Sequence, residues 1–260
     1  MADLILEGIV VKKVVVKDHD LLVVILNRAG NLCDIYCYGG QSSRKGKSSL
    51  LEIGMMNRYS VHLKRSGSYV LKSVEPIWGY RNIRFNYLLF SALALICELA
   101  SVLAIKTDER EYNKELFKIF SNSVFHLDRT EEHDVLSLLV LLVVKLLSFM
   151  GVMIDCEFCI YSAKSITAEH SLILDFSIGG FGISQFNTTE IQGESDSDLW
   201  KIVKVYSHTS FKQLPLRFDI SVGHLNKLLQ FLFFQLNLSM EQFNSLRLFN
   251  QAVKKYLSEN

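Results

Sequence analysis

The chain has 260 residues, of which 49% are hydrophobic and 21% are charged, and its formal net charge is +1. This length fits two domains of ordinary size, and this composition excludes general disorder. Residues 1–80 carry 11 Lys and Arg against 7 Asp and Glu, whereas the remainder carries 17 against 20. A basic face can therefore lie in the N-terminal part despite the neutral average, although chance also accounts for so small an asymmetry.

The first 80 residues have the pattern of short strands. Runs rich in Val, Ile, Leu and Tyr alternate with polar turns, which predicts strands over residues 4–16, 21–26, 32–38, 55–64 and 69–78. The turns at residues 27–31 and 66–68 contain Gly and have hairpin length. Five strands in a compact, partly open antiparallel barrel are typical of the OB-fold, whose exposed strand face and loops bind oligonucleotides.

The pattern changes to helical spacing after Pro76, so we expect a domain boundary near residue 80. The first domain is then an OB-fold nucleic-acid-binding domain over residues 1–80, and the second is a mainly helical domain over residues 81–260. Helices are predicted over residues 82–104, 111–125, 131–150, 221–236 and 239–257. Ser221 and Ser239 are predicted to begin the last two of these. Residues 155–198 are predicted to be an irregular insertion, and the fold class is α+β.

Two apolar stretches, residues 88–105 and 135–154, are long enough to resemble membrane spans. Each contains a charge, Glu98 in the first and Lys145 in the second, which costs about 2.5–3.5 kcal/mol in a bilayer. We therefore expect buried helices and no membrane, with a membrane-associated protein as the alternative. The first residues lack the pattern of a secretory signal, and this favours a cytoplasmic location.

The most informative segment is the loop at residues 39–49, which contains two leading glycines, four serines and the cations Arg44, Lys45 and Lys47. Such a loop can bring backbone amides, hydroxyls such as that of Ser48, and positive charges to phosphates. It is not a Walker phosphate loop, because the Gly-Lys order and the first glycine do not coincide and because a strand is expected to follow. The alternative is a solvated hairpin loop.

Further basic and aromatic residues lie on the neighbouring strands and turns. The candidate DNA contacts are Arg44, Lys45, Lys47, Ser48, Lys12, Arg28, Lys64 and Arg65, with Lys13 nearby. Tyr36, Tyr38, Tyr59 and Tyr69 are available for stacking on bases, although each tyrosine alone is more typical of core or edge packing.

The order of these elements resembles the RecO family of bacterial recombination and repair proteins. The resemblance is carried by the segments at residues 8–13, 17–22 and 26–30, by the basic loop that ends at Ser48, and by Glu75-Pro76 at the barrel's exit. It covers about residues 5–105. It implies a non-enzymatic mediator that binds single- and double-stranded DNA, anneals complementary strands, recognises the acidic C-terminal tail of the single-stranded DNA-binding protein, and loads RecA together with RecR.

Absences in the sequence agree with that implication. No Walker motif, nucleophile elbow, zinc-protease motif or acidic two-metal cluster is present, and His62, His126 and His208 are scattered over different elements. We therefore expect no catalytic residue. An OB-fold module that binds only a protein, without DNA-binding activity, remains the alternative.

The five cysteines are odd in number and are predicted to be reduced thiols. Many RecO proteins carry two Cys-x-x-Cys pairs that hold zinc, and Cys156 and Cys159 stand where the first pair is expected. Residues 181–186, at the place of the second pair, contain no cysteine, and His170 supplies at most a third ligand. Because a closed structural zinc site needs four ligands, zinc is not expected, and the two thiols are at most a remnant half-site in a degenerate zinc-finger-like insertion.

Overall fold

The computed structural model describes residues 3–17, 19–41, 47–65, 67–107, 113–186, 195–214, 216 and 218–259. The chain divides into two compact units, one formed by Met1–Glu132 with Phe243–Asn260 and the other by His133–Gln242. The first unit thus contains the expected barrel together with helices from both ends of the expected helical domain. Whether the barrel over residues 1–80 folds by itself stays a prediction.

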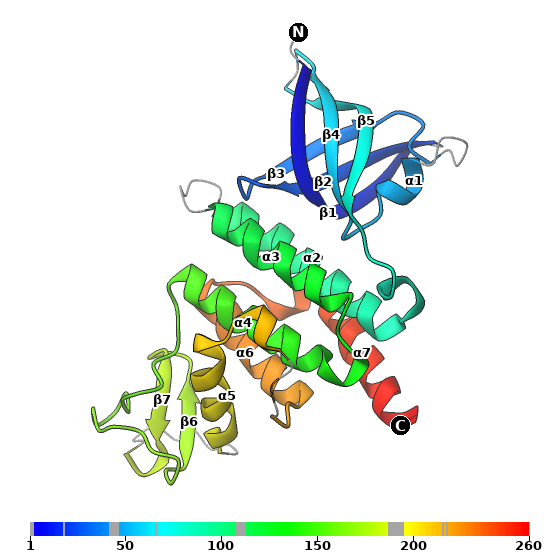
Figure 1. Cartoon of the computed structure of the whole chain (residues 1–260). Helices are drawn as coiled ribbons and strands as arrows, with labels where there is room; N and C mark the ends of the chain where they lie inside the picture. The colour runs from blue at the N-terminus through cyan, green and yellow to red at the C-terminus, as the bar shows by residue number, and fades with distance from the viewer. Residues whose placement is uncertain are drawn as a thin grey trace. The chain divides into compact units, whose positions relative to one another are not determined.

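Five strands form a closed barrel at the N-terminus, as the sequence predicts (Figure 1). They are β1 (Asp3–Lys17), β2 (Asp20–Asn27), β3 (Leu32–Cys37), β4 (Met56–Leu63) and β5 (Tyr69–Trp78). The order around the ring is β1-β2-β3-β5-β4. The expectation of a wholly antiparallel, partly open barrel was wrong in detail, because β3 and β5 pair in parallel and close the ring. The result is an OB-like mixed sheet.

Alternating side chains fill the barrel's interior. Leu21, Val23 and Ile25 of β2 are fully buried, whereas Leu22 and Val24 between them are only partly buried. This period of two is the one that a half-buried strand imposes on its sequence. The burial of Tyr59 in β4 is also complete, and its hydroxyl accepts a hydrogen bond from Asn57 at 3.1 Å.

A short helix, α1 (Lys47–Leu50), occupies the end of the segment at residues 39–49. The sequence had predicted that a strand follows this segment directly. β4 then begins only at Met56. The helix has four residues, so it offers a single turn rather than the long helix that a phosphate loop requires. The segment therefore lacks the long helix of a Walker site, although the strand that was predicted to follow it directly is not there.

Three helices complete the first unit. They are α2 (Tyr87–Lys106), α3 (Asn113–Leu127) and α7 (Asn244–Glu259), and α2 packs against both of the others (Figure 1). Gly30, in the β2–β3 turn, has φ +85°, and a Cβ there would lie 1.9 Å from the carbonyl oxygen of Asn113. Only glycine allows the turn to approach the start of α3 so closely.

The second unit contains α4 (Val135–Met150), α5 (Ser197–His208) and α6 (Val222–Gln235), with α4 packed against the other two. It also contains a hairpin of β6 (Leu172–Asp175) and β7 (Gly180–Ile183). The prediction that residues 155–198 are irregular was therefore wrong for the hairpin, and α5 was missed. Short 3-10 helices lie at Ile83–Phe85, Glu132–Asp134, Ser184–Phe186, Phe211–Gln213 and Met240–Gln242.

Helix ends differ from the predicted ones where a 3-10 turn precedes the helix. Ser221 caps α6 as predicted, since its hydroxyl accepts from the amide of His224 at 3.3 Å. Ser239 instead precedes a 3-10 turn, and α7 begins five residues later at Asn244. Likewise, α4 begins at Val135, because its expected acidic first turn is itself a 3-10 helix.

The two apolar helices are core helices. Helices at Tyr87–Lys106 and Glu132–Met150 are long and apolar enough to cross a membrane, but 67% of each apolar window is buried within the protein. The charges within them act as caps of other helices. Glu98 accepts from the amide of Ser245 at 3.0 Å, in the first turn of α7, and Lys145 donates to the carbonyl of Ser207 at 3.2 Å, in the last turn of α5. Both contacts have the sign that a helix dipole favours.

Candidate nucleic-acid interface

The basic loop is only partly described by the structure. Arg44 and Lys45 lie outside the described residues, and Lys47 is described only as the first residue of α1. Ser48, the second residue of α1, is partly buried. The loop's three cations therefore remain predicted DNA contacts.

A cluster of aromatic and basic side chains stands where the chain enters this loop. Lys64 donates to the hydroxyl of Tyr38 at 2.9 Å, and its ammonium lies 5.3 Å from that ring's centroid. The ring of Tyr36 meets that of Tyr38 edge-on, with 4.7 Å between centroids. Tyr38 is 58% exposed and directly precedes Gly39. Proteins that bind single-stranded nucleic acids use exposed aromatic rings to stack on bases and nearby cations to contact phosphates.

Asp20 fixes the inner part of this cluster. It accepts from the hydroxyl of Tyr36 at 2.8 Å and from the amide of Gly39 at 2.8 Å. The hydrogen bond to this carboxylate, together with partial burial, raises the pKa of Tyr36 to about 12. The hydroxyl of Tyr36 therefore stays protonated at neutral pH and ties the end of β3 to the start of β2.

The other candidate tyrosines differ in exposure. Tyr59 is completely buried, so it packs in the core, as is typical of a single tyrosine, and does not offer a platform for bases. Burial raises the pKa of its hydroxyl. Tyr69 is partly buried at the start of β5, opposite Leu63 of β4. Tyr38 is thus the most exposed of the four.

Arg28 lies at the opposite end of β3 from Lys64. Its guanidinium pairs with the carboxylate of Glu7, which also accepts from Arg58 at 2.9 Å. Hydrogen bonds from Arg58 and Arg28 hold the pKa of Glu7 below its ordinary value. Two half-exposed guanidinium groups thus converge on a single carboxylate, and the group keeps one net positive charge.

Sequence reasoning named Arg28 but missed Arg58. The signal was present, because Arg58 is the exposed residue in the buried pattern of β4 and stands opposite Glu7 in the β1–β4 register. Finding it requires knowing that β1 and β4 are neighbours, which the order of strands in the sequence does not reveal.

The remaining candidates occupy separate places on the barrel. Lys12 is exposed on β1 at the bulge between Val10 and Lys12, and Arg65 is exposed in the β4–β5 turn. Lys13 is engaged by Glu52, 2.7 Å away. Because β3 has six residues, about 17 Å separates its Arg28 end from its Lys64 end. Of the described candidates, Arg28 thus lies at one end of β3 and Lys64 with Arg65 at the other, whereas Lys12 lies apart on β1. A strand of DNA that contacts both ends of β3 must run along the barrel.

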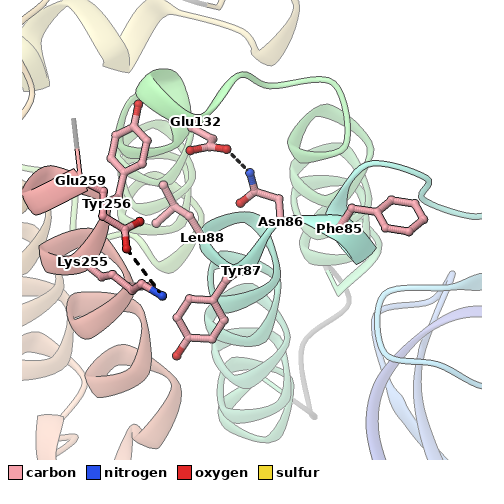
Figure 2. Close-up of a pocket in the computed structure, with 9 residues that line it drawn as sticks. Phe85, Asn86, Tyr87, Leu88, Glu132, Lys255, Tyr256 and Glu259 are labelled. Carbon is pink, nitrogen blue, oxygen red and sulfur yellow. Dashed lines mark hydrogen bonds and ion pairs between the residues drawn. The ribbon is translucent and has the colours of Figure 1, made fainter.

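A pocket of about 210 Å³ lies between the start of α2 and the last turns of α7. Figure 2 shows the side chains that line it. Its charged residues are Glu132, Glu259 and Lys255, and Lys255 pairs with Glu259 at 3.8 Å. Glu132 accepts from the side chain of Asn86, as the dashed line in the figure marks. Two carboxylates against one ammonium make this pocket unsuited to a phosphate or to an acidic peptide.

The cysteine pair lies in the second unit. The sulfur of Cys159 accepts from the amide of Ile183 at 3.2 Å. Cys156, three residues earlier, is also buried. Burial raises the pKa of Cys156 to about 12. Burial alone would also raise the pKa of Cys159, but amides of Ile183 and Tyr161 that donate to its sulfur bring that pKa below its ordinary value.

A metal site would need further ligands around this pair. In the part of the chain that the structure describes, no group of three or more His, Cys, Asp or Glu side chains could hold a metal ion. His170 instead accepts from the amide of Thr167 at 3.0 Å. The place of the second cysteine pair is taken by the buried strand β7, whose Phe181 and Ile183 are apolar. The donor set therefore does not fit a closed zinc site.

Comparison with known proteins agrees with the resemblance read from the sequence. The family model described as "Recombination protein O C terminal" matches residues 84–192. The DNA repair protein RecO of Bacillus pumilus (strain SAFR-032) is 28% identical over 171 residues, which are 65% of this chain and 64% of that protein. The match thus spans slightly less than two thirds of the relative. Over these residues the chain is similar to RecO proteins of DNA repair and recombination, and the OB-like barrel at its N-terminus agrees with that similarity.

Proposed function

We propose that this protein is a non-enzymatic recombination mediator that binds single- and double-stranded DNA and anneals complementary strands. The observation that carries the proposal is the Lys64–Tyr38 cluster, which stands on an OB-like barrel at the entrance to a loop with three further cations. Similarity to RecO proteins of DNA repair and recombination supports the same function. In the cell we expect it to act in the cytoplasm, with RecR, in loading RecA.

Annealing needs no covalent chemistry. Two DNA strands repel each other as polyanions, and a protein that neutralises the phosphates of one strand lowers that repulsion. Contacts made to phosphates leave the base edges free for the incoming strand. A barrel with separate cationic groups along β3 suits this task, because it holds one strand by its backbone over several nucleotides.

A labelled single-stranded oligonucleotide titrated with the protein over a series of salt concentrations tests the proposal. We expect affinity to fall linearly with salt on logarithmic axes, with a slope of about −0.7 for each phosphate contacted. Complementary labelled strands should anneal faster with the protein than without it. The alternative, a barrel that binds only protein, predicts no DNA binding even at low salt.

We propose that the acidic tail of the single-stranded DNA-binding protein binds to a surface other than the DNA-binding surface of the barrel. The pocket in Figure 2 carries an excess of acid and is unsuited to that ligand. We place tail binding C-terminal to about residue 80, without assigning its residues.

A further inference from the structure

A second pocket of the first unit, of about 290 Å³, lies where β1, β4 and β5 meet α3. Its floor follows the register of the barrel, because Ile9 pairs with Met56 across β1 and β4, and Met56 pairs with Trp78 across β4 and β5. Ile9 and Met56 are buried, and so is Phe117 of α3. The base of this pocket is therefore apolar, and the β4–β5 register shifts beside it, between Met56 and Asn57.

Aromatic rings form its sides. Trp78 is partly buried, and its ring centroid lies 5.8 Å from that of Phe125, with an angle of 32° between the ring planes. The guanidinium of Arg129 lies 3.6 Å from the centroid of Phe125 and thus holds this ring in place. Two tilted rings present flat surfaces, which favour a flat ligand over a branched aliphatic one.

The opening of the pocket is basic. Arg28 lines it, and its guanidinium lies 6.0 Å from the ring centroid of Phe117. Arg58 shares the carboxylate of Glu7 with Arg28, so two guanidinium groups and one carboxylate stand together here. The pocket in Figure 2 has the opposite balance of charge. A matching ligand is a flat apolar ring joined to an anion.

We infer that this pocket receives one unpaired base of single-stranded DNA, stacked on Trp78, while Arg28 contacts an adjoining phosphate. The inference rests on the proposed DNA-binding function and adds to it a place for a base. A pocket near the lower limit of about 300 Å³ for ligand sites has room for one base rather than for a base pair. Single strands should therefore bind more tightly than duplexes, and with little preference for sequence, because every base has a face on which to stack.

The fluorescence of Trp78 reports directly on this stacking. The chain has two tryptophans, and the other, Trp200, is buried in the second unit with its indole N–H donated to the carbonyl of Cys156 at 2.8 Å. Addition of saturating oligothymidylate should quench part of the emission of the unaltered protein. In the Trp78→Phe variant, where Trp200 alone emits, the same addition should leave the emission unchanged.

Binding energetics give a second, independent test. Stacking of one base on an aromatic side chain changes affinity by about 5- to 150-fold. The affinities of the unaltered protein and of Trp78→Leu are measured for oligothymidylate and for an abasic oligomer of the same length. Trp78→Leu should weaken binding of oligothymidylate within that range and leave binding of the abasic oligomer unchanged. This cycle isolates the contact between ring and base.

A matched control is Phe85→Leu, which removes a 91% exposed aromatic ring outside this pocket and should change neither affinity. The abasic comparison on the unaltered protein needs no variant, so a misfolded Trp78→Leu would not leave the inference untested. Suppose that the unaltered protein binds DNA with the expected salt dependence, but that its emission is not quenched and that Trp78→Leu weakens binding of oligothymidylate and of the abasic oligomer equally. The pocket assignment is then wrong and the proposed function stands.

Two other outcomes would also overturn the inference. Absence of DNA binding at low salt would remove both the pocket assignment and the proposed function. Quenching of Trp78 by an acidic peptide with an aromatic C-terminal residue, but not by DNA, would assign the pocket to a protein partner instead.

Discussion

Arg58 contacts a single oxygen of Glu7, Oε1, through two of its nitrogens, at 2.9 Å from Nε and 2.8 Å from Nη2. Arg28 takes the other oxygen of the same carboxylate. Glu7 therefore occupies the position that a phosphate would take between these two arginines. In the proposed DNA complex a phosphate that binds here has to displace or share this carboxylate, so we expect Glu7 to lower the affinity of the barrel for DNA.

Replacement of Glu7 by Gln should strengthen DNA binding. The variant keeps a hydrogen-bonding side chain of similar size but removes the negative charge between Arg28 and Arg58. If Arg58 then gains one phosphate contact besides the one proposed for Arg28, the slope of log affinity against log salt becomes steeper by about 0.7. As a matched control, Asp198→Asn removes the carboxylate of an exposed ion pair with Lys201 in the second unit and should leave the slope unchanged. An identical slope for Glu7→Gln and the parent would contradict this role of Glu7.

The same carboxylate should contribute a pH-dependent part of the stability. The pKa of Glu7 in the folded protein lies below its ordinary value of 4.5, chiefly because Arg58 and Arg28 donate to it. A group whose folded pKa is lowered stabilises the fold fully above its unfolded pKa and loses that contribution as pH falls through the folded pKa. Glu7→Gln should thus lower the free energy of unfolding at pH 7 by about 1 kcal/mol or less. Urea unfolding of the parent and of Glu7→Gln at pH 7 and well below pH 4.5 checks this. A difference in stability between the two proteins that persists at the lower pH would count against it.

Much of the fold could be predicted from the sequence because local patterns determine it. All five barrel strands follow from alternation and turn residues, and the long helices follow from their apolar runs. The ring order could not be predicted, because the parallel pairing of β3 with β5 rests on two residue pairs, Ile35 with Tyr69 and Tyr36 with Val70. α5 was missed although its buried residues Leu199, Trp200, Val203 and Tyr206 have helical spacing, because its start, Ser197, follows a long polar stretch.

The candidate residues of the site could be predicted from the sequence, but the contacts between them could not, because those contacts depend on how the strands pair. Lys64 and Tyr38 are 26 residues apart, and only the closure of the barrel brings the ammonium to the hydroxyl. Nor does the sequence show that Glu7 pairs with Arg28 and Arg58, which come from three different elements. The burial of Tyr59 follows from its place in the alternation of β4 and could have been anticipated.

The purified protein should contain no stoichiometric zinc, because Cys156 and Cys159 supply only half of a four-ligand set. The hairpin around them is instead held by packing and by contacts such as the hydrogen bond from Tyr161 to Asp175 at 2.9 Å. A structural zinc ion contributes about 10–16 kcal/mol in small metal-dependent domains, so its removal would be conspicuous. Chelator should leave the melting temperature unchanged. One zinc per chain by elemental analysis after dialysis would show this prediction to be wrong.

Tail binding and DNA binding should be separable in the full-length protein. A fluorescent peptide that copies the acidic tail of the cognate single-stranded DNA-binding protein should bind equally to the parent and to a variant with Arg44, Lys45 and Lys47 replaced by Ala. The reason is that the proposed tail site lies C-terminal to about residue 80. Loss of peptide affinity in a variant with an unchanged melting temperature would place the tail on the barrel loop.

The most direct test of the account is the salt dependence of single-stranded DNA binding by the same variant, with Arg44, Lys45 and Lys47 replaced by Ala. If each cation contacts one phosphate, the slope of log affinity against log salt should be shallower by about 2, since single strands lose about 0.7 per contact. Affinity should fall alike for all sequences, annealing should fall with it, and stability should change by less than about 0.5 kcal/mol. A folded variant that keeps the parental slope and anneals normally would show that this loop is only a connector between strands.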